Sequence, residues 1–326
     1  MEVAVIIPTL NEEKFIGKCL DSVISQSYPF EKMDIMVIDG RSNDKTREIV
    51  DEYHRKYNNI RLIDNPGKIQ SIAFNIGVRE STAQYVVRLD AHALYDSRYI
   101  ELCVAGLTEN SHRGNVGGMW EIIPQNDSLM AETNAILNYS KFGIGGAAFR
   151  VGGQAQDVDT VPFGAFSRKV IDEIGGMRED LPRGEDNEYN SRIRKAGYLI
   201  HFNPAIKCKY YARATFKASA KQMLANGESI GILYHIDRTA IGLRHIIPVL
   251  FVLGLIAGPI LSVIYAPFFF VLLAALAIYL TCDLIASLSV AIKHGWKYIL
   301  PIFVLFPIVH ISYGIGTIIG LFKKKY

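Results

Sequence analysis

The chain has 326 residues, a net formal charge of +3, and a composition that is 50% hydrophobic and 21% charged. So small a positive charge argues against a nucleic-acid-binding protein, which neutralises phosphates with many Lys and Arg side chains. The four cysteines are scattered and include no Cys-x-x-Cys pair. They therefore indicate neither a disulfide framework nor a zinc site, in agreement with a reducing cytoplasm.

The apolar residues gather toward the end of the chain. Residues 1–245 carry charges throughout, whereas residues 246–321 carry only Asp283, Lys293 and Lys297. A helix needs about 20 predominantly apolar residues to cross a bilayer. The sequence therefore predicts two to three hydrophobic segments in this region. The candidates are Ile246–Tyr265, Pro267–Ile292 and Ile299–Phe322.

The first ninety residues alternate between strand and helix patterns. Four short runs rich in β-formers are expected to be strands: Val3–Pro8, Asp34–Ile38, Ile60–Ile63 and Tyr85–Leu89. Apolar residues at helical spacing follow the first three strands, with Asn11 and Asn43 as expected N-caps of the first two helices and Ile69–Val78 as the third. Such alternation implies an α/β domain with a parallel sheet that helices cover on both faces.

The later part of the chain divides by pattern. From Ala93 to Arg213 it loosens into mixed strands, glycine-rich loops and short helices, which we interpret as the acceptor half of the same domain. The expected organisation is an α/β domain over 1–213, an amphipathic helical link at the membrane surface over 214–245, and a membrane region over 246–326. The chain enters a strand at once, so no cleavable signal peptide is expected.

Polar residues follow three of the predicted strands, where an open α/β sheet binds its ligands. The loop Pro8–Glu12 offers backbone N–H groups to a nucleotide, although an ordinary N-cap would also explain Asn11. Asp39 could accept a hydrogen bond from a ribose or base. Asp90 and His92 are both able to bind a divalent ion, although a surface turn explains an Asp-x-His sequence equally well.

Two further segments carry charges suited to chemistry. Lys68 could reach a phosphate or be a solvated lysine at a helix start. The segment Arg183–Glu188 holds three carboxylates within four residues, and their mutual repulsion favours a role such as general base on a hydroxyl. An acidic helix N-terminus stabilised by the macrodipole is the alternative. Neither a P-loop nor a G-x-G-x-x-G motif is present, which argues against a P-loop ATPase and a dinucleotide dehydrogenase.

Together these segments resemble the inverting glycosyltransferase family 2, which has the GT-A fold. Within that family the chain is most similar to succinoglycan-type membrane glucosyltransferases of exopolysaccharide synthesis, through Val161–Phe166 and Arg183–Tyr198. The resemblance covers about residues 1–235. The motifs that carry it are Val5–Glu12, Val37–Thr46, Asp90-Ala91-His92 and Glu185-Asp186.

The resemblance implies a role for each candidate. Asp186 would be the catalytic base, Asp90 and His92 would hold Mg²⁺ or Mn²⁺, and Phe163, Gly164 and Glu185 would lie in a loop that contacts donor or acceptor. His92 stands where most members have a second Asp, and Gly40 where many have another. The residues expected to bind the nucleotide-diphospho-sugar are Pro8, Thr9, Asn11, Glu12, Asp39, Lys68 and Asp90.

The expected function is that of a membrane-anchored hexosyltransferase of cell-surface polysaccharide or glycan synthesis. It would move a sugar, with inversion, from a UDP-sugar to a hydroxyl of a lipid-linked glycan. A polyprenyl-phosphate sugar synthase is the alternative, and activity that survives loss of Asp186 would favour it. A non-catalytic sugar-nucleotide-binding membrane scaffold is a third possibility, and a transporter fits poorly because Asp283 is the only charge well inside a span.

The basic residues predict the membrane topology. Residues 1–245 are expected in the cytoplasm, because Arg238 and Arg244 flank the first span and resist translocation. The same rule places the tail Lys323–Lys325 in the cytoplasm, which requires that one of the three apolar segments does not cross fully. Ile299–Phe322, with two internal prolines, is the candidate for a broken or re-entrant segment.

Overall fold

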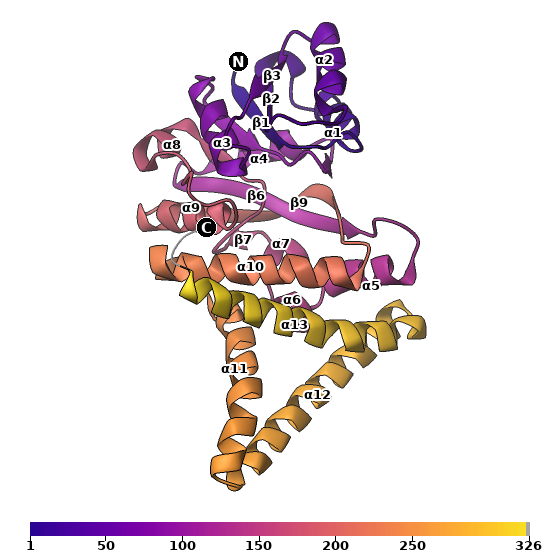
Figure 1. Ribbon diagram of the computed structural model, residues 1–326. Helices are drawn as coiled ribbons and strands as arrows, with labels where there is room; N and C mark the ends of the chain where they lie inside the picture. Colours follow the sequence, from indigo (N-terminus) through magenta and orange to yellow (C-terminus); the bar gives the residue numbers. More distant parts are fainter. Residues whose placement is uncertain (324–326) are drawn as a thin grey trace. The chain divides into compact units, whose positions relative to one another are not determined.

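The computed structural model describes residues 1–323, which pack into two compact units (Figure 1). The first, here called the sheet unit, consists of Met1–Glu121 and Ala147–Tyr210. The second, the helical unit, consists of Ile122–Gly146 and the chain from Tyr211 onward. Each unit is therefore discontinuous in sequence. The domain boundaries predicted at 213 and 245 stay a prediction.

The alternation predicted for the first ninety residues is confirmed in the sheet unit. Strands β1 to β4 are mutually parallel, with β1 between β2 and β4. All seven residues of β1 are buried, as expected for a strand with helices on both faces. The elements are β1 Val3–Thr9, α1 Ile16–Ile24, β2 Met33–Asp39, α2 Thr46–Lys56, β3 Ile60–Asp64, α3 Gln70–Arg79 and β4 Tyr85–Arg88, with a short 3-10 turn at Phe30–Lys32.

The second half of the sheet unit is antiparallel. Strand β8 pairs antiparallel with both β4 and β6, so the complete sheet is mixed, in the order β3-β2-β1-β4-β8-β6-β9-β5, with β7 beside β9. Phe74, Phe166 and Tyr189 pack edge to face and join α3, β8 and α9 in the core. The elements are β5 Ala93–Tyr95, α4 Tyr99–Glu109, β6 Arg113–Ile123, α7 Ala148–Val151, β7 Gln156–Asp157, β8 Ala165–Ser167, α8 Arg168–Ile174, α9 Glu185–Lys195 and β9 Leu199–Tyr211.

The helical unit holds the apolar segments. Helix α10 lies within the link predicted over 214–245. By length and composition alone, α11, α12 and the helix Trp296–Phe322 could each cross a membrane. The elements are α5 Leu129–Leu137, α6 Lys141–Ile144, α10 Phe216–Ile236, α11 Leu243–Ile264, α12 Pro267–His294 and α13 Ile299–Phe322, with 3-10 turns at Arg238–Ala240 and Trp296–Tyr298.

Candidate active site

The loops after β1 and β2 are locked to each other by side chains. The N–H of Asn11 donates to Ser42 Oγ at 2.8 Å, and Asn11 Oδ1 accepts from the N–H of Asn43 at 2.9 Å. The N–H of Glu12 donates to Thr46 Oγ1 at 2.8 Å. The prediction that Asn11 and Asn43 cap α1 and α2 is wrong, because neither helix has a side-chain cap. Their polar groups bridge two loops instead of closing their own helices.

Asp39 ends β2 and is fully buried. Its Oδ2 accepts from the N–H of Ser42 at 2.9 Å and from Arg47 Nη1 at 2.8 Å, and the same guanidinium nitrogen reaches Asp64 Oδ1 at 2.7 Å. Arg47 was missed in the sequence, where it looks like an ordinary residue of an exposed helix. The Arg47 guanidinium compensates the buried charge of Asp39, and the Asp39 carboxylate in turn holds the loop that follows β2. Contact of Asp39 with a ribose or base stays a prediction.

The other predicted donor residues differ in exposure. Pro8 and Thr9 are buried, and Thr9 Oγ1 donates to the carbonyl of Ile7 at 3.0 Å. Lys68 is exposed and has a φ of 62°, and its backbone lies beside Gly40, where an added Cβ would come within 3.3 Å of Lys68 Cα. The loop after β3 thus adjoins the end of β2. Among residues 1–323, no ion pair or hydrogen bond occupies the ammonium group of Lys68, which leaves it available to a phosphate.

Asp90 and His92 follow β4 and face each other. His92 Nε2 lies 4.0 Å from Asp90 Oδ2, and His92 Nδ1 lies 3.0 Å from Glu12 Oε1. In that arrangement Glu12 orients the imidazole, as carboxylates do behind metal-binding histidines. Asp90 Oδ1 is buried and accepts no hydrogen bond in the described residues. These features fit a divalent cation, although residues 1–323 contain no cluster of three or more His, Cys, Asp or Glu side chains that could hold one. The chain would therefore supply two ligands.

A buried arginine joins this site to the acidic segment far along the chain. Arg88 Nη2 lies 3.2 Å from Glu185 Oε1 and 3.6 Å from Asp90 Oδ1, and it also donates to Gln70 Oε1 at 2.5 Å. Burial raises the pKa of the Glu185 carboxyl to about 7, an effect that Arg88 opposes and the charge of Asp186 increases. The sequence shows Arg88 as a charge within an apolar strand, two residues before Asp90, and that signal could have revealed it.

The three carboxylates at the start of α9 have different surroundings. Glu185 contacts Arg88, and Glu188 is bound by Arg192 through contacts of 2.7 and 2.9 Å. Asp186 is half-buried and, within residues 1–323, forms no ion pair. Its Oδ1 accepts from the N–H of Asn187 at 2.8 Å. Of the three, Asp186 is therefore the carboxylate that no cation of residues 1–323 occupies.

Phe163 and Gly164 line one small recess together with Arg88 and Asp186. A Cβ added at Gly164 would lie 1.9 Å from Asn115 Oδ1, so only glycine fits there. Phe163 is buried and has a φ of 48°, an uncommon conformation for a bulky residue. The carbonyl of Phe163 accepts a hydrogen bond from Tyr99 at 3.0 Å, which holds the loop. Strain of this kind concentrates at functional sites.

An aromatic group next to His92 was also missed from the sequence. The Tyr210 ring lies 5.8 Å from His92 and stacks on Trp120 at 4.3 Å, and the guanidinium of Arg150 lies 4.8 Å from the Trp120 ring. These residues come from β9, β6 and α7, so no local pattern connects them. Tyr210 is half-buried and places an aromatic ring beside the predicted metal ligand.

Comparison with known proteins finds similar sequences and a similar fold. Residues 4–175 match the model of Glycosyl transferase family 2. A dolichyl N-acetyl-α-D-glucosaminyl phosphate 3-β-D-2,3-diacetamido-2,3-dideoxy-β-D-glucuronosyltransferase of Methanococcus voltae is 32% identical over 238 residues, covering 71% of this chain and 73% of that protein. Succinoglycan biosynthesis protein ExoA of Rhizobium meliloti (strain 1021) is 28% identical over 262 residues, covering 80% and 78%.

One solved structure shows the same fold over almost the whole chain. It is the mannosyltransferase PcManGT from Pyrobaculum calidifontis in complex with GDP-Man and Mn²⁺, with a TM-score of 0.61 and 18% identity. The match covers 96% of this chain and 86% of that one. The predicted GT-A domain followed by long apolar helices is confirmed.

Proposed function

Because the chain belongs to glycosyl transferase family 2, we propose that it is a membrane-anchored, inverting hexosyltransferase that acts on a lipid-linked glycan. The observation that carries the proposal is the juxtaposition in one unit of Asp90, Arg88 and the Glu185-Asp186 pair. Arg88 contacts Asp90 and Glu185 and lines the same small recess as Asp186, a carboxylate with no ion pair among the described residues.

In the proposed reaction, Asp186 accepts the proton of an acceptor hydroxyl. The hydroxyl oxygen then attacks the anomeric carbon from the face opposite the diphosphate, and the bond to the diphosphate breaks. A single displacement of this kind inverts the anomeric centre, so an α-linked donor yields a β-glycoside. A general base typically contributes ~10²–10⁴-fold to the rate.

The metal and the loops serve the donor. Asp90 and His92 would hold Mg²⁺ or Mn²⁺, which supplies positive charge to the leaving diphosphate. Glu12 keeps the His92 ring oriented, and Arg88 holds Glu185 close to Asp186. The loops after β1 and β2, with Lys68, form the surface for the nucleotide, which we take to be uridine diphosphate.

The proposed acceptor is a hydroxyl on a glycan carried by a polyprenyl-type lipid. The name of the Methanococcus voltae relative specifies a dolichyl-linked sugar phosphate as its substrate. The long apolar helices of this chain support an acceptor that stays in the membrane. Activated sugar nucleotides are made in the cytoplasm, and we therefore propose that the sheet unit lies on that side of the cell membrane.

A transfer assay tests the proposal. Full-length enzyme in membranes is offered a panel of radiolabelled nucleotide sugars, and the labelled lipid products are extracted. We expect Asp186→Asn to abolish transfer while donor binding stays close to that of the wild type. Glu188→Gln serves as the matched control on the same helix, because Arg192 rather than substrate occupies that carboxylate.

Two results would contradict the assignment. If Asp186→Asn keeps more than a few per cent of wild-type turnover, Asp186 is not the base. If the product is instead a lipid-phosphate-linked monosaccharide whose formation survives this substitution, the enzyme is a polyprenyl-phosphate sugar synthase.

A further inference from the structure

The three long apolar helices of the helical unit differ in what they contact. In the most apolar stretch of α11 and of α12, 11% and 6% of the residues are buried, against 39% for the helix Trp296–Phe322. Figure 1 shows why: α13 lies beside α10, whereas α11 and α12 run away from that pair and meet at the turn near Tyr265. Helix α13 therefore has a more extensive protein face than the other two.

Glycines bring the backbones of α10 and α13 into direct contact. A Cβ added at Gly316 would lie 2.0 Å from the carbonyl oxygen of Leu224, and one at Gly320 would lie 2.1 Å from that of Glu228. From the other side, a Cβ at Gly227 would lie 2.1 Å from the carbonyl oxygen of Tyr313. Neither lipid nor water fits between helices packed so closely. The two helices must therefore enter the hydrocarbon of a membrane together or stay out of it together.

Helix α10 is too polar for the interior of a bilayer. It carries Lys217, Lys221 and Glu228, and its Ser219 donates to Asn134 of α5 at 2.6 Å. A charged residue at the centre of a membrane helix costs about 2.5–3.5 kcal/mol on the insertion scale. If α13 crossed the membrane with α10 attached, these charges and amides would enter the hydrocarbon.

Ion pairs hold both ends of α13 to polar elements of the same unit. Just before the helix, Lys297 Nζ donates to Glu132 Oε2 at 2.8 Å, and the hydroxyl of Tyr298 donates to the same oxygen at 2.8 Å. Just after it, Lys323 Nζ donates to Glu228 Oε1 at 2.7 Å. These contacts place the two ends of α13 on one side of any membrane.

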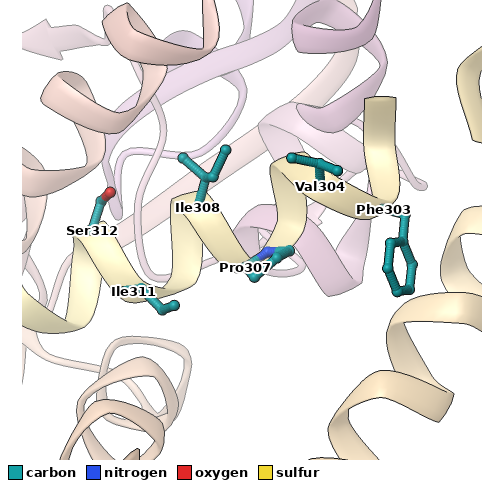
Figure 2. A pocket seen from close by; sticks show the side chains of 6 residues that line it. All are labelled: Phe303, Val304, Pro307, Ile308, Ile311 and Ser312. Atoms are coloured by element: carbon teal, nitrogen blue, oxygen red, sulfur yellow. The ribbon is translucent and has the colours of Figure 1, made fainter. Parts of the chain in front are cut away.

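The face of α13 that α10 leaves uncovered is an apolar stripe. Leu300, Val304, Ile315 and Phe322 recur at helical spacing and are 69%, 43%, 40% and 86% exposed. Figure 2 shows the middle of this helix, where a shallow hollow is lined almost entirely by apolar side chains. Its lining residues are Phe303, Val304, Pro307, Ile308, Ile311 and Ser312. An apolar face backed by a polar helix is the pattern of a helix that lies in a membrane interface.

We infer that α13 lies in the plane of the membrane surface, with α10 on its water side and its apolar stripe in the lipid. Only α11 and α12 then cross, as a hairpin. The inference depends on the proposed membrane anchoring and not on the proposed chemistry. It places Lys297 and Lys323 on the side of α10, in agreement with the positive-inside rule.

Cysteine labelling in full-length protein tests the sidedness. In a Cys282→Ser background, single variants Ala266→Cys, Trp296→Cys and Lys323→Cys are treated with an impermeant maleimide on intact cells. We expect Ala266→Cys, in the turn between α11 and α12, to be labelled from outside. The other two are expected to react only after permeabilisation. A cysteine appended after Tyr326 repeats the test without breaking the Lys323 ion pair, and transfer activity confirms that each variant is folded.

Spin labels measure depth and separate the in-plane helix from a re-entrant one. Labels at Val304, Ile315 and Phe322 in lipid vesicles are expected to give one similar, shallow depth of oxygen and nickel accessibility. External labelling of the carboxyl terminus would overturn the inference in favour of three complete spans. If the carboxyl terminus is labelled only after permeabilisation but the spin-label depth is greatest in the middle of the helix, α13 is a re-entrant segment and the inference is overturned. Absence of transfer activity from the parent Cys282→Ser protein, with the expected labelling of its variants, would count against the proposed function and leave this inference standing.

Discussion

Two regions of the sheet unit differ in how their polar groups are hydrogen-bonded. One consists of the loops after β1 and β2, here called the donor loops, and the other is the charged group Arg88, Asp90 and Glu185 between β4 and α9. Around Asn11 and Asp39, side chains form hydrogen bonds with the backbone of the loop after β2, and Asp39 is fully buried. Around Asp90, by contrast, a buried carboxylate oxygen and the Nε of Arg88 have no hydrogen-bond partner within residues 1–323. Buried polar groups without partners are costly, and we therefore expect a ligand to complete those around Asp90. The comparison predicts which residues shape the site and which react.

After the loss of transfer expected for Asp186→Asn, the largest effect is expected at the proposed metal ligands. Asp90→Ala removes the one anionic ligand, and we expect transfer to fall by ~10²–10³-fold, since a metal supplies several kcal/mol of charge stabilisation. His92→Ala should lose less, because imidazole is the poorer ligand for a hard cation, and excess Mn²⁺ should restore part of its rate. Turnover is measured against metal concentration. Full activity of the wild type in excess chelator would show that neither residue acts through a metal.

Replacement of Arg88 is expected to lower the stability of the fold, because it removes the cation from a buried group of charges. Arg88→Met leaves Glu185 and Asp90 without a cation, and removing one partner of a buried pair typically costs about 3–5 kcal/mol of stability. We expect a clear fall in thermal unfolding temperature and in activity. The double variant Arg88→Met with Glu185→Gln should recover much of the stability without recovering turnover. Equal stability of the single and double variants would mean that Arg88 and Glu185 are not coupled.

The donor loop should respond through binding rather than through chemistry. Asn11→Ala removes the bond to Asn43 and places alanine at a φ of 55°. We expect a donor KM several-fold higher with kcat nearly unchanged. Asn11→Gly is the matched control, because glycine tolerates this φ and loses only the side chain. If Asn11→Ala instead lowers kcat as much as Asp186→Asn does, the separation between shaping and reacting residues fails.

The most gradual effect is expected in the dependence of stability on pH. Burial raises the pKa of Glu185 from 4.5 to about 7, so between these values the folded state retains a proton that the unfolded state has lost. This carboxyl therefore stabilises the fold less as pH rises through that window, by up to about 3 kcal/mol. Unfolding temperatures of the wild type and Glu185→Gln in chelator-containing buffer measure the slope, which the variant should reduce. Identical slopes would contradict the assignment.

Some parts of the site could be predicted because their signals are local. Asp39, Asp90 and His92 follow strands that the apolar pattern identifies, and parallel strands bring their carboxyl ends to one edge. Arg47 and Tyr210 could not be found in that way, and for Arg88 only its position within an apolar strand was a signal. Each acts through a partner on another element, such as Glu185 for Arg88. The N-cap assignments of Asn11 and Asn43 failed for the same reason, because the two loops bond to each other.

The sequence by itself determined the strand and helix alternation of the first ninety residues, the motifs of a family 2 glycosyltransferase and the three long apolar helices. Those features depend on periodicity, turn residues and hydrophobic length, which are properties of contiguous segments. Only the tertiary structure decided which carboxylate of Glu185, Asp186 and Glu188 is left without an ion pair among the described residues. It also distinguished α13 from α11 and α12, because three sequences that are each long and apolar enough to cross a membrane differ in how far a polar helix packs against them.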